Sequence, residues 1–384
     1  MKPLAGLKVL ELARILAGPW CGQLLADLGA EVIKVERSGA GDDTRQWGPP
    51  FVTDTCGNAW GAAYFHSCNR GKSSVAIDID TEDGQAAVRA LAAEADVVIE
   101  NFKVGGLAKY GLDYSSLKRI NQRLIYASIT GFGQDGPYAA RAGYDYIIQG
   151  MSGLMDITGA PDAEPQKVGV AIVDIFTGLY TATAILAAIR GRDLSGEGCH
   201  IDMSLLDSAT AILANQGMNY LVSGVSPTRL GNAHPNIAPY QVFEVADGHV
   251  IIAVGNDSQF RKFCEAIGAN HLLADDLYQS NKNRVAHRDS LQTALQPSLK
   301  TFTRTQLLAA LEAAGVPAGP INRIEDVFND PQIVHRGMKL DLEAADGSPV
   351  SGIASPIVIN GVRMAAESPS PRLGSGQPTW KSSQ

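Results

Sequence analysis

The chain has 384 residues and a mass of 40.6 kDa, enough for one large domain or two to three ordinary ones. Hydrophobic residues make up 45% of the sequence and charged residues 19%, so a sizeable core can form and global disorder is excluded. The formal net charge of −8 argues against nucleic acid or an anionic membrane as the main partner, while leaving room for a local basic site that binds an anionic cofactor.

The first half of the chain alternates strand and helix patterns. Helices are predicted at 19–29, ended by Gly29, at 84–95, capped by Asp80 or Thr81, and at 115–121. Strands separated by helices imply an α/β fold with a parallel sheet and right-handed crossovers. The apolar patterns predict its strands at 7–12, 31–36, 74–79, 97–99 and 124–130.

A long apolar helix is predicted from 177 to 190. The uncharged runs around it, 168–173 and 175–189, are shorter than the ~20 residues that a bilayer requires, so we expect a buried helix of a soluble protein. A strand at 200–205 and a helix after Asp207 follow.

Residues 223–239 are rich in Gly, Pro, Asn and Ser, a composition that indicates a linker. Beyond it we expect a small domain over 225–325, with a hairpin turning at Asp247-Gly248 and helices at 258–267 and 304–314. The tail from Ser368 is rich in Pro, Ser and Gly and is expected to run over the surface.

The five cysteines are scattered and contain no C-x-x-C pair, so neither a disulfide framework nor a zinc ribbon is indicated. The start of the chain lacks a long apolar run, and we therefore expect no signal peptide and a cytoplasmic location. The histidines form no H-x-x-x-H or H-E-x-x-H motif, so no metal site is expected.

Asp174 carries the clearest chemical signal, because it is the only charged residue between Lys167 and Arg190. One interpretation makes it the N-cap of the helix from 177. The other places its carboxylate in a cleft beside a helix N-terminus, where the macrodipole keeps the anion available as a nucleophile. The two interpretations are compatible, since a capping carboxylate can also react.

Other motifs are weaker. Gly39-Ala40-Gly41 lacks the third glycine of a dinucleotide loop, and no G-x-S-x-G of a serine hydrolase occurs. Arg37, Arg70 and Lys72 lie in loops after predicted strands. Such residues are often solvated surface, but at strand ends of a parallel sheet they could hold phosphates.

Several short segments, each weak alone, form a strong match together. They include 3–12, 17–19, 28–36, 41–45, 69–73, 100–102, 129–133, 143–145 and 330–332. In this order and spacing the sequence resembles the class III CoA-transferases, the group of formyl-CoA transferase and carnitine CoA-transferase, over nearly the whole chain.

The resemblance implies that Asp174 is the catalytic nucleophile and that Tyr144 and Asp145 are an active-site pair. Gly255 stands where the family has a mobile glycine-rich loop, of which one glycine remains. Formyl-CoA transferase has glutamine at the position of Leu16 and arginine at that of Lys109. The catalytic residues would be Asp174, Asp145 and Gly255, and the CoA-binding residues Leu16, Ala17, Arg37, Asn69, Lys72, Asn101, Phe102, Lys109, Arg141 and Tyr144.

The family's architecture implies a Rossmann-like large domain, formed by 1–224 and by the return of the chain at 326–384. A smaller α+β domain would occupy 225–325. Two such chains would form an interlocked homodimer. No cofactor would be bound permanently, because coenzyme A and its acyl esters are substrates, and neither nucleic acid nor membrane would be a partner.

The implied reaction moves CoA between carboxylic acids through a covalent intermediate on Asp174. Segments 231–241 and 255–260 resemble the branch that contains succinyl-CoA:glutarate CoA-transferase, which favours a dicarboxylic acid. Formyl or oxalyl transfer stays open. The rival with the same fold is an α-methylacyl-CoA racemase, which carries histidine where this chain has Tyr144. A phenol, with an ordinary pKa of ~10, is a poor acid–base group near neutral pH.

Overall fold

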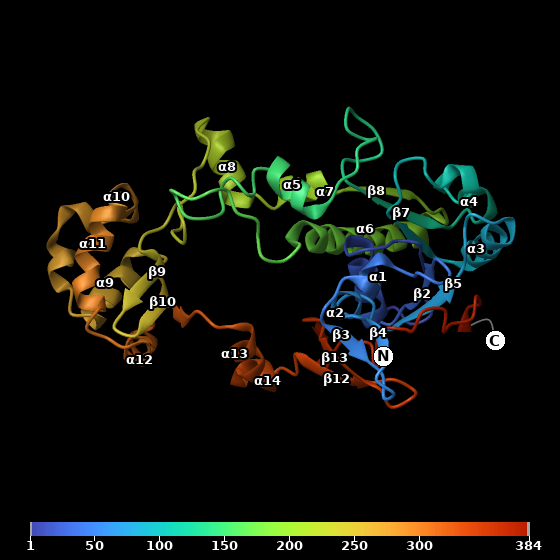
Figure 1. Ribbon diagram of the computed structural model, residues 1–384. Coiled ribbons are helices and arrows are strands. Elements are labelled where there is room, and N and C mark those ends of the chain that lie inside the picture. Colours follow the sequence, from blue (N-terminus) through green and yellow to red (C-terminus); the bar gives the residue numbers. More distant parts are fainter. Residues whose placement is uncertain (1, 382–384) are drawn as a thin grey trace. The chain divides into compact units, whose positions relative to one another are not determined.

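The computed structural model describes residues 2–381 and divides into two compact units, whose elements are labelled in Figure 1. The first unit comprises Met1–Ser152, Val168–Leu213 and Asp330–Gln384, and the second comprises Gly153–Lys167 and Ala214–Asn329.

These bounds differ from the predicted 225–325. Helix α8 (Ala214–Ser223) belongs to the second unit, where Asn219 exchanges hydrogen bonds with Asn236. Segment 153–167 joins the same unit, in which Asp156 pairs with Arg229 at 3.1 Å. Both contacts link residues far apart in sequence, which composition alone does not reveal.

The first unit is built on a six-stranded parallel sheet with the order β5-β2-β1-β6-β7-β8 (Figure 1). The chain builds outward from β1 to β5 and then from β6 to β8, so the strand order reverses between β1 and β6. Loops that leave the carboxyl ends of two such strands diverge and leave a crevice, where α/β proteins bind ligands. The strands are Lys8–Glu11 (β1), Glu31–Glu36 (β2), Lys72–Ala76 (β5), Val97–Glu100 (β6), Ile125–Thr130 (β7) and His200–Ser204 (β8).

Both faces of the sheet are buried. Neighbouring residues of a strand point to opposite faces, so Val9 joins one hydrophobic core and Leu10 the other. This two-sided burial explains why the strands read as nearly continuous apolar runs. The first core contains residues of α1 (Ala17–Asp27), α5 (Asp145–Met151), α6 (Ile172–Ser195) and α7 (Leu205–Ala211), and the second contains residues of α3 (Glu82–Glu94) and α4 (Tyr114–Ile120).

Helix α6 begins five residues earlier than predicted, at Ile172, and ends at Ser195. By length and composition alone it could cross a membrane. One face, which includes Val173 and Ile185, packs into the first core, so the predicted burial holds for that face. The other face leaves Leu179, Tyr180, Leu186 and Leu194 exposed by 38%, 41%, 39% and 73%.

The C-terminal tail from Ser368 is mostly exposed or half-buried, as predicted, but it is anchored by a buried side chain that the composition did not reveal. Trp380 is 1% exposed within the second core, and its indole N–H donates to the carbonyl of Leu91 at 3.2 Å. Burying such a large side chain stabilises the unit, because Trp removes a large apolar area from water. The remaining helices and strands of the first unit are η1 (Asp43–Gln46), β3 (Phe51–Thr53), β4 (Ala59–Ala62), α2 (Ala63–His66), η2 (Ala108–Tyr110), α14 (Pro331–His335), β12 (Lys339–Glu343), β13 (Pro349–Ile353), β14 (Val358–Ile359) and β15 (Val362–Arg363).

The second unit has its own core around a three-stranded antiparallel sheet with the order β11-β10-β9. The predicted hairpin is confirmed, although its two-residue turn is Ala246-Asp247, one residue before the predicted position. The elements after α8 are β9 (Tyr240–Val245), β10 (Gly248–Ala253), α9 (Asp257–Ala266), η3 (Asn270–Ala274), η4 (Asp276–Tyr278), α10 (Asn281–Ala286), α11 (Arg288–Leu299), α12 (Arg304–Ala314), β11 (Ala318–Pro320) and α13 (Ile324–Asn329).

Candidate active site

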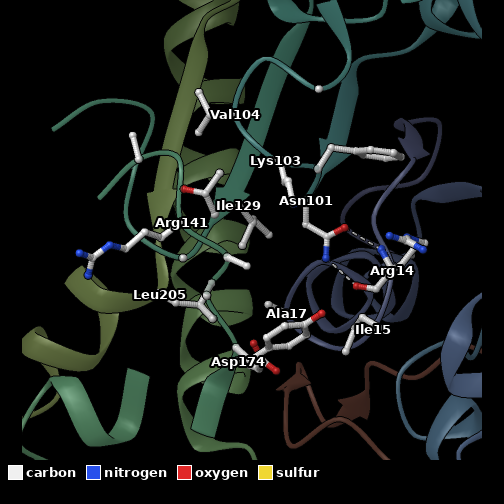
Figure 2. A pocket seen from close by; sticks show the side chains of 18 of the residues that line it. Arg14, Ile15, Ala17, Asn101, Lys103, Val104, Ile129, Arg141, Asp174 and Leu205 are labelled. Carbon is white, nitrogen blue, oxygen red and sulfur yellow. Dashed lines mark hydrogen bonds between the residues drawn. The ribbon is translucent and has the colours of Figure 1, made fainter. Parts of the chain in front are cut away.

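A cavity of about 450 Å³ lies at the carboxyl ends of the central strands. Its walls come from the loops that follow β1, β6, β7 and β8, which is the place where the reversal of strand order predicts a ligand site. Figure 2 shows Asp174 near Ala17 in this cavity. The lining residues include 14–17, most of 101–106, 109–110, 129–131, most of 139–144, Asp174 and Leu205.

Asp174 lies in the first turn of α6, and the helix is capped from another element. Ala171 occupies the N-cap position, where its methyl side chain cannot accept a hydrogen bond. The Asp145 carboxylate supplies the missing acceptor, because its Oδ2 accepts the N–H of Val173 at 2.8 Å and that of Asp174 at 3.3 Å. The interpretation of Asp174 as the N-cap is therefore wrong, and Asp145 caps the helix instead.

The same arrangement sets the protonation of Asp174. Burial raises the pKa of its carboxyl to about 7, and the nearby Asp145 charge adds to the effect. The helix macrodipole, which we expected to keep this group ionised, acts against both effects. Near pH 7 the nucleophilic anion is therefore populated only in part.

Tyr64 is a neighbour of Asp174 that the sequence analysis did not name, although it does not line the cavity. It lies on α2, and burial, followed by the charge of Asp174, raises the pKa of its phenol to about 12. Its ring packs edge-on against Trp47, with the centroids 5.3 Å apart. The phenol therefore stays protonated and uncharged near neutral pH. No motif near Tyr64 could have found it, since its relation to Asp174 depends on the fold.

Asn101 joins the loops that follow β1 and β6. Its side-chain amide accepts the N–H of Arg14 at 2.9 Å and donates to the carbonyl of Arg14 at 2.6 Å (Figure 2). The Arg14 guanidinium lies 5.8 Å from the ring centroid of Phe102, which also lines the cavity. Asn101 thus lies in the predicted place, but its amide holds the wall of the cavity together.

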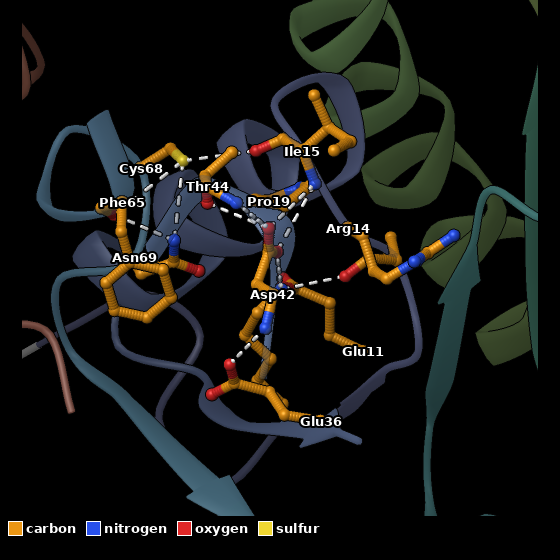
Figure 3. Close-up of polar contacts among 12 residues, drawn as sticks. Glu11, Arg14, Ile15, Pro19, Glu36, Asp42, Thr44, Phe65, Cys68 and Asn69 are labelled. Atoms are coloured by element: carbon orange, nitrogen blue, oxygen red, sulfur yellow. Dashed lines mark hydrogen bonds and ion pairs between the residues drawn. The ribbon is translucent and has the colours of Figure 1, made fainter. Parts of the chain in front are cut away.

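Ile15 has an unusual backbone in this wall. Its φ of 73° is in the left-handed region, which a β-branched residue rarely adopts. The carboxylate of Asp42 accepts its N–H at 3.2 Å and so holds the strained turn (Figure 3). This turn brings Leu16 and Ala17 into the cavity wall, as the sequence analysis predicted.

The match to a family of known chemistry covers most of the chain. A family model described as CoA-transferase family III matches residues 4–377. The chain belongs to this family.

The names of individual relatives are consistent with this family. The chain is 56% identical to the succinate–glutarate CoA-transferase of Agrobacterium fabrum, over 98% of this chain and 94% of the relative. It is 42% identical to the succinyl-CoA:glutarate CoA-transferase of Mus musculus, over 97% of this chain and 84% of the relative. The crystal structure of a CAIB/BAIF family protein from Brucella suis has a TM-score of 0.86 and 58% identity, with 97% of each chain covered.

Lys72 and Asn69, which the resemblance assigned to CoA binding, lie outside the cavity in this CoA-transferase. The side chain of Lys72 has no exposed surface, and its Nζ contacts Glu11 at 2.8 Å, the carbonyl of Pro19 at 2.8 Å and Asn69 at 2.9 Å. Asn69 is also fully buried and donates to the carbonyl of Phe65. Neither residue lines the cavity, and both are held by buried hydrogen bonds, which Figure 3 shows for Asn69 and Phe65.

The cationic residues predicted to bind CoA lie at the rim. Lys109 and Arg141 are exposed and line the main cavity. Arg37 is 60% exposed at its side chain and lines a second cavity of about 170 Å³. The two cavities are neighbours, because Arg14, Phe102 and Tyr110 line both of them.

The remaining predicted residues divide between the two units. Tyr144 lines the main cavity and is 59% exposed. Asp145 does not line it, because its carboxylate is turned to the start of α6. Gly255 belongs to the second unit, where its N–H donates to Gln259 Oε1 at 2.7 Å, and its catalytic role stays a prediction. Over residues 2–381, no group of three or more His, Cys, Asp or Glu is arranged to hold a metal ion.

Proposed function

We propose that this CoA-transferase moves CoA between succinyl-CoA and glutarate through a covalent intermediate on Asp174. The observation that carries the proposal is a carboxylate with a pKa of about 7 in a cavity with cationic residues on its rim. The names of the two relatives that share 56% and 42% identity support the choice of the two acids.

In the first step, Asp174 Oδ attacks the thioester carbonyl of succinyl-CoA, the C–S bond breaks, and a succinyl–aspartyl anhydride and CoA thiolate form. The thiolate then attacks the Asp174 carboxyl carbon, which releases succinate and leaves an aspartyl-CoA thioester. Glutarate attacks this thioester, and the thiolate that departs attacks the glutaryl carbon of the new anhydride. Glutaryl-CoA and the Asp174 carboxylate result, with no net proton or electron transfer.

Each intermediate would be destroyed by water, so the site must exclude it. The amides at the start of α6 are already bonded to Asp145 and are therefore not available to an oxyanion.

The nucleotide end of CoA is assigned to the smaller cavity beside Arg37, and the thioester end to the cavity with Asp174. Charge-assisted hydrogen bonds from a guanidinium to phosphate are stronger than neutral ones. Lys109 and Arg141 on the rim of the main cavity would contribute further positive charge.

A second copy of the chain is the proposed cover for the uncovered face of α6. Leu179, Tyr180, Leu186 and Leu194 form an apolar stripe that a dimer would bury, as the family resemblance implies. Sedimentation at nanomolar concentration should give a particle of twice 40.6 kDa. A compact monomer under these conditions would contradict the interlocked dimer. A cytoplasmic location also stays a proposal, supported by the five free thiols and testable by cell fractionation.

The function is tested by mixing the enzyme with succinyl-CoA alone and trapping the adduct with hydroxylamine. Wild type should yield a modified peptide that contains Asp174, while Asp174→Ala should bind CoA, form no adduct and lose several orders of magnitude in turnover. Near-normal transfer by Asp174→Ala would refute the mechanism.

A panel of acceptors separates the alternatives that the sequence left open. Transfer to glutarate should exceed transfer to formate or oxalate, and the reverse order would reject the dicarboxylate assignment. Rapid exchange of the α-hydrogen of a 2-methylacyl-CoA in deuterated water, without an acid acceptor, would favour the racemase.

A further inference from the structure

We propose that Gln149 is a positioning residue for the nucleophile, which fixes Asp145 so that Asp145 can hold the first turn of α6 and with it Asp174. The inference rests on the proposed role of Asp174 as nucleophile. It assigns a function to a buried amide that does not line the cavity.

Gln149 and Asp145 lie on the same face of α5. They are four residues apart, a spacing that places side chains next to each other on a helix. Gln149 is 0% exposed, and its Nε2 donates to Asp145 Oδ1. Its Oε1 accepts the N–H of Val168 at 2.9 Å. Both ends of the amide are therefore engaged, which fixes its orientation.

The two carboxylate oxygens of Asp145 accept hydrogen bonds from different partners. Oδ1 accepts from Gln149, while Oδ2 accepts from Val173 and Asp174. A carboxylate held at one oxygen cannot rotate freely, so Gln149 keeps Oδ2 aimed at the start of α6. Ala171 offers no replacement cap, and these donors would otherwise stay unsatisfied in a partly buried place.

Gln149 also holds the segment that leads into the helix. Val168 precedes the start of α6 at Ile172 by four residues, and its N–H bond to Gln149 restrains this approach. One side chain thus connects the segment before α6 with the residue that caps it. A displaced first turn would move the Asp174 carboxylate relative to the thioester, and a shift of 1 Å can cost on the order of 100-fold in rate.

The charges around Asp174 determine what a change at Gln149 does to its titration. Asp145 on α5 accepts the N–H of Asp174 and its charge raises the pKa of the Asp174 carboxyl, while Tyr64 on α2 is close enough for the Asp174 charge to raise the pKa of its phenol. The charged side chains that line the same cavity are Arg14, Lys103, Lys109 and Arg141. A carboxylate at position 149 would add a negative charge next to Asp145. Among residues 2–381, no cationic side chain forms a described hydrogen bond with Asp145 that could offset this charge.

The chain offers a matched control for a purely structural role. Gln23 on α1 is 6% exposed and likewise uses both ends of its amide, donating to the carbonyl of Ser67 at 3.1 Å and accepting the N–H of Arg70 at 2.8 Å. Gln23→Met and Gln149→Met therefore each remove two side-chain hydrogen bonds of a buried glutamine and introduce the same side chain.

The experiment measures single-turnover formation of the Asp174 adduct with succinyl-CoA between about pH 5.5 and 8.5. Gln149→Met should lower this rate about 10- to 100-fold, with the KM for succinyl-CoA changed less than about twofold, because the residue does not line the cavity. Gln23→Met should lose comparable stability in urea but keep the wild-type rate.

Gln149→Glu gives a second, independent readout. A protonated glutamate keeps both a donor for Asp145 and an acceptor for Val168, whereas the ionised form loses the donor and repels Asp145. Burial and the Asp145 charge both disfavour the ionised form of a glutamate at this position, so its ionisation and the loss of the donor advance as the pH rises. The ratio of its rate to that of wild type should therefore fall as pH rises.

The proposal is overturned if Gln149→Met reacts at the rate of Gln23→Met, or if the ratio for Gln149→Glu is independent of pH. If Gln149→Met does not fold, the pH trend of Gln149→Glu still decides. Failure of the wild type to form any adduct would instead refute the proposed function, so the two failures are distinguishable.

Discussion

Replacement of Lys72 by methionine should unfold this CoA-transferase more easily and leave CoA binding by the folded enzyme unchanged. Lys72 and Lys34 lie with Glu11 and Asp42 in a cluster whose side chains are completely or almost completely buried, and in which two positive charges balance two negative ones. The substitution leaves one negative charge in excess. It also removes the donor for the carbonyl of Pro19 at 2.8 Å.

Removing one partner of a buried ion pair costs about 3–5 kcal/mol. In a protein of this size each kcal/mol corresponds to about 2–4 °C, so the melting temperature should fall by about 6–20 °C. Urea unfolding gives the free energy, and calorimetric titration with CoA gives the affinity. Lys109→Met is the control, because Lys109 is exposed on the cavity rim. This substitution should weaken CoA binding and leave the free energy of unfolding nearly unchanged. A stable Lys72→Met enzyme that binds CoA weakly would refute the reasoning and restore Lys72 as a CoA ligand.

Further expectations concern the cavity and its rim. The adduct-forming rate should rise with pH through about 7 and level off above, because only the ionised Asp174 attacks, and a flat profile down to pH 5 would contradict the burial effect. Arg37→Ala should raise the KM of succinyl-CoA by about 10- to 150-fold, the equivalent of ~1.5–3 kcal/mol, without changing that of glutarate in steady-state assays. Gly143→Ala should inactivate the enzyme, since the new Cβ would lie 2.4 Å from the Cα of Gly131 and displace Tyr144; wild-type kinetics would exclude that displacement.

The strands of the parallel sheet could be predicted because each strand has a recognisable pattern within a few consecutive residues. A strand buried on both faces gives an apolar run, and β2 at Glu31–Glu36 has the predicted bounds. The ends of the helices were harder to predict from the sequence. Helix α6 starts at Ile172 because Asp145, 29 positions before Asp174, satisfies its first amides, and no local pattern contains that information.

The type of a residue marked candidates for the site, whereas the partners of those residues depend on the fold. An isolated aspartate in an apolar stretch marked Asp174, but the effect of burial on its pKa required the fold. A lysine after a glycine suggested a phosphate ligand at Lys72. Its actual partner, Glu11, lies 61 positions away in the chain, beyond the reach of any sequence window. Tyr64 had no marker at all.

The burial of Trp380 has a consequence for synthesis on the ribosome. All six strands of the large sheet precede residue 205, yet the core on one face of that sheet is completed by Trp380, which follows the whole second unit in the chain. Domains tend to fold as units while the chain emerges. The second unit, complete at Asn329, can therefore finish folding while the first still waits for its last segment. A ribosome that stalls between Asn329 and Trp380 would thus hold a chain with a folded second unit and an open hydrophobic face on the first, a natural target for chaperones and proteases.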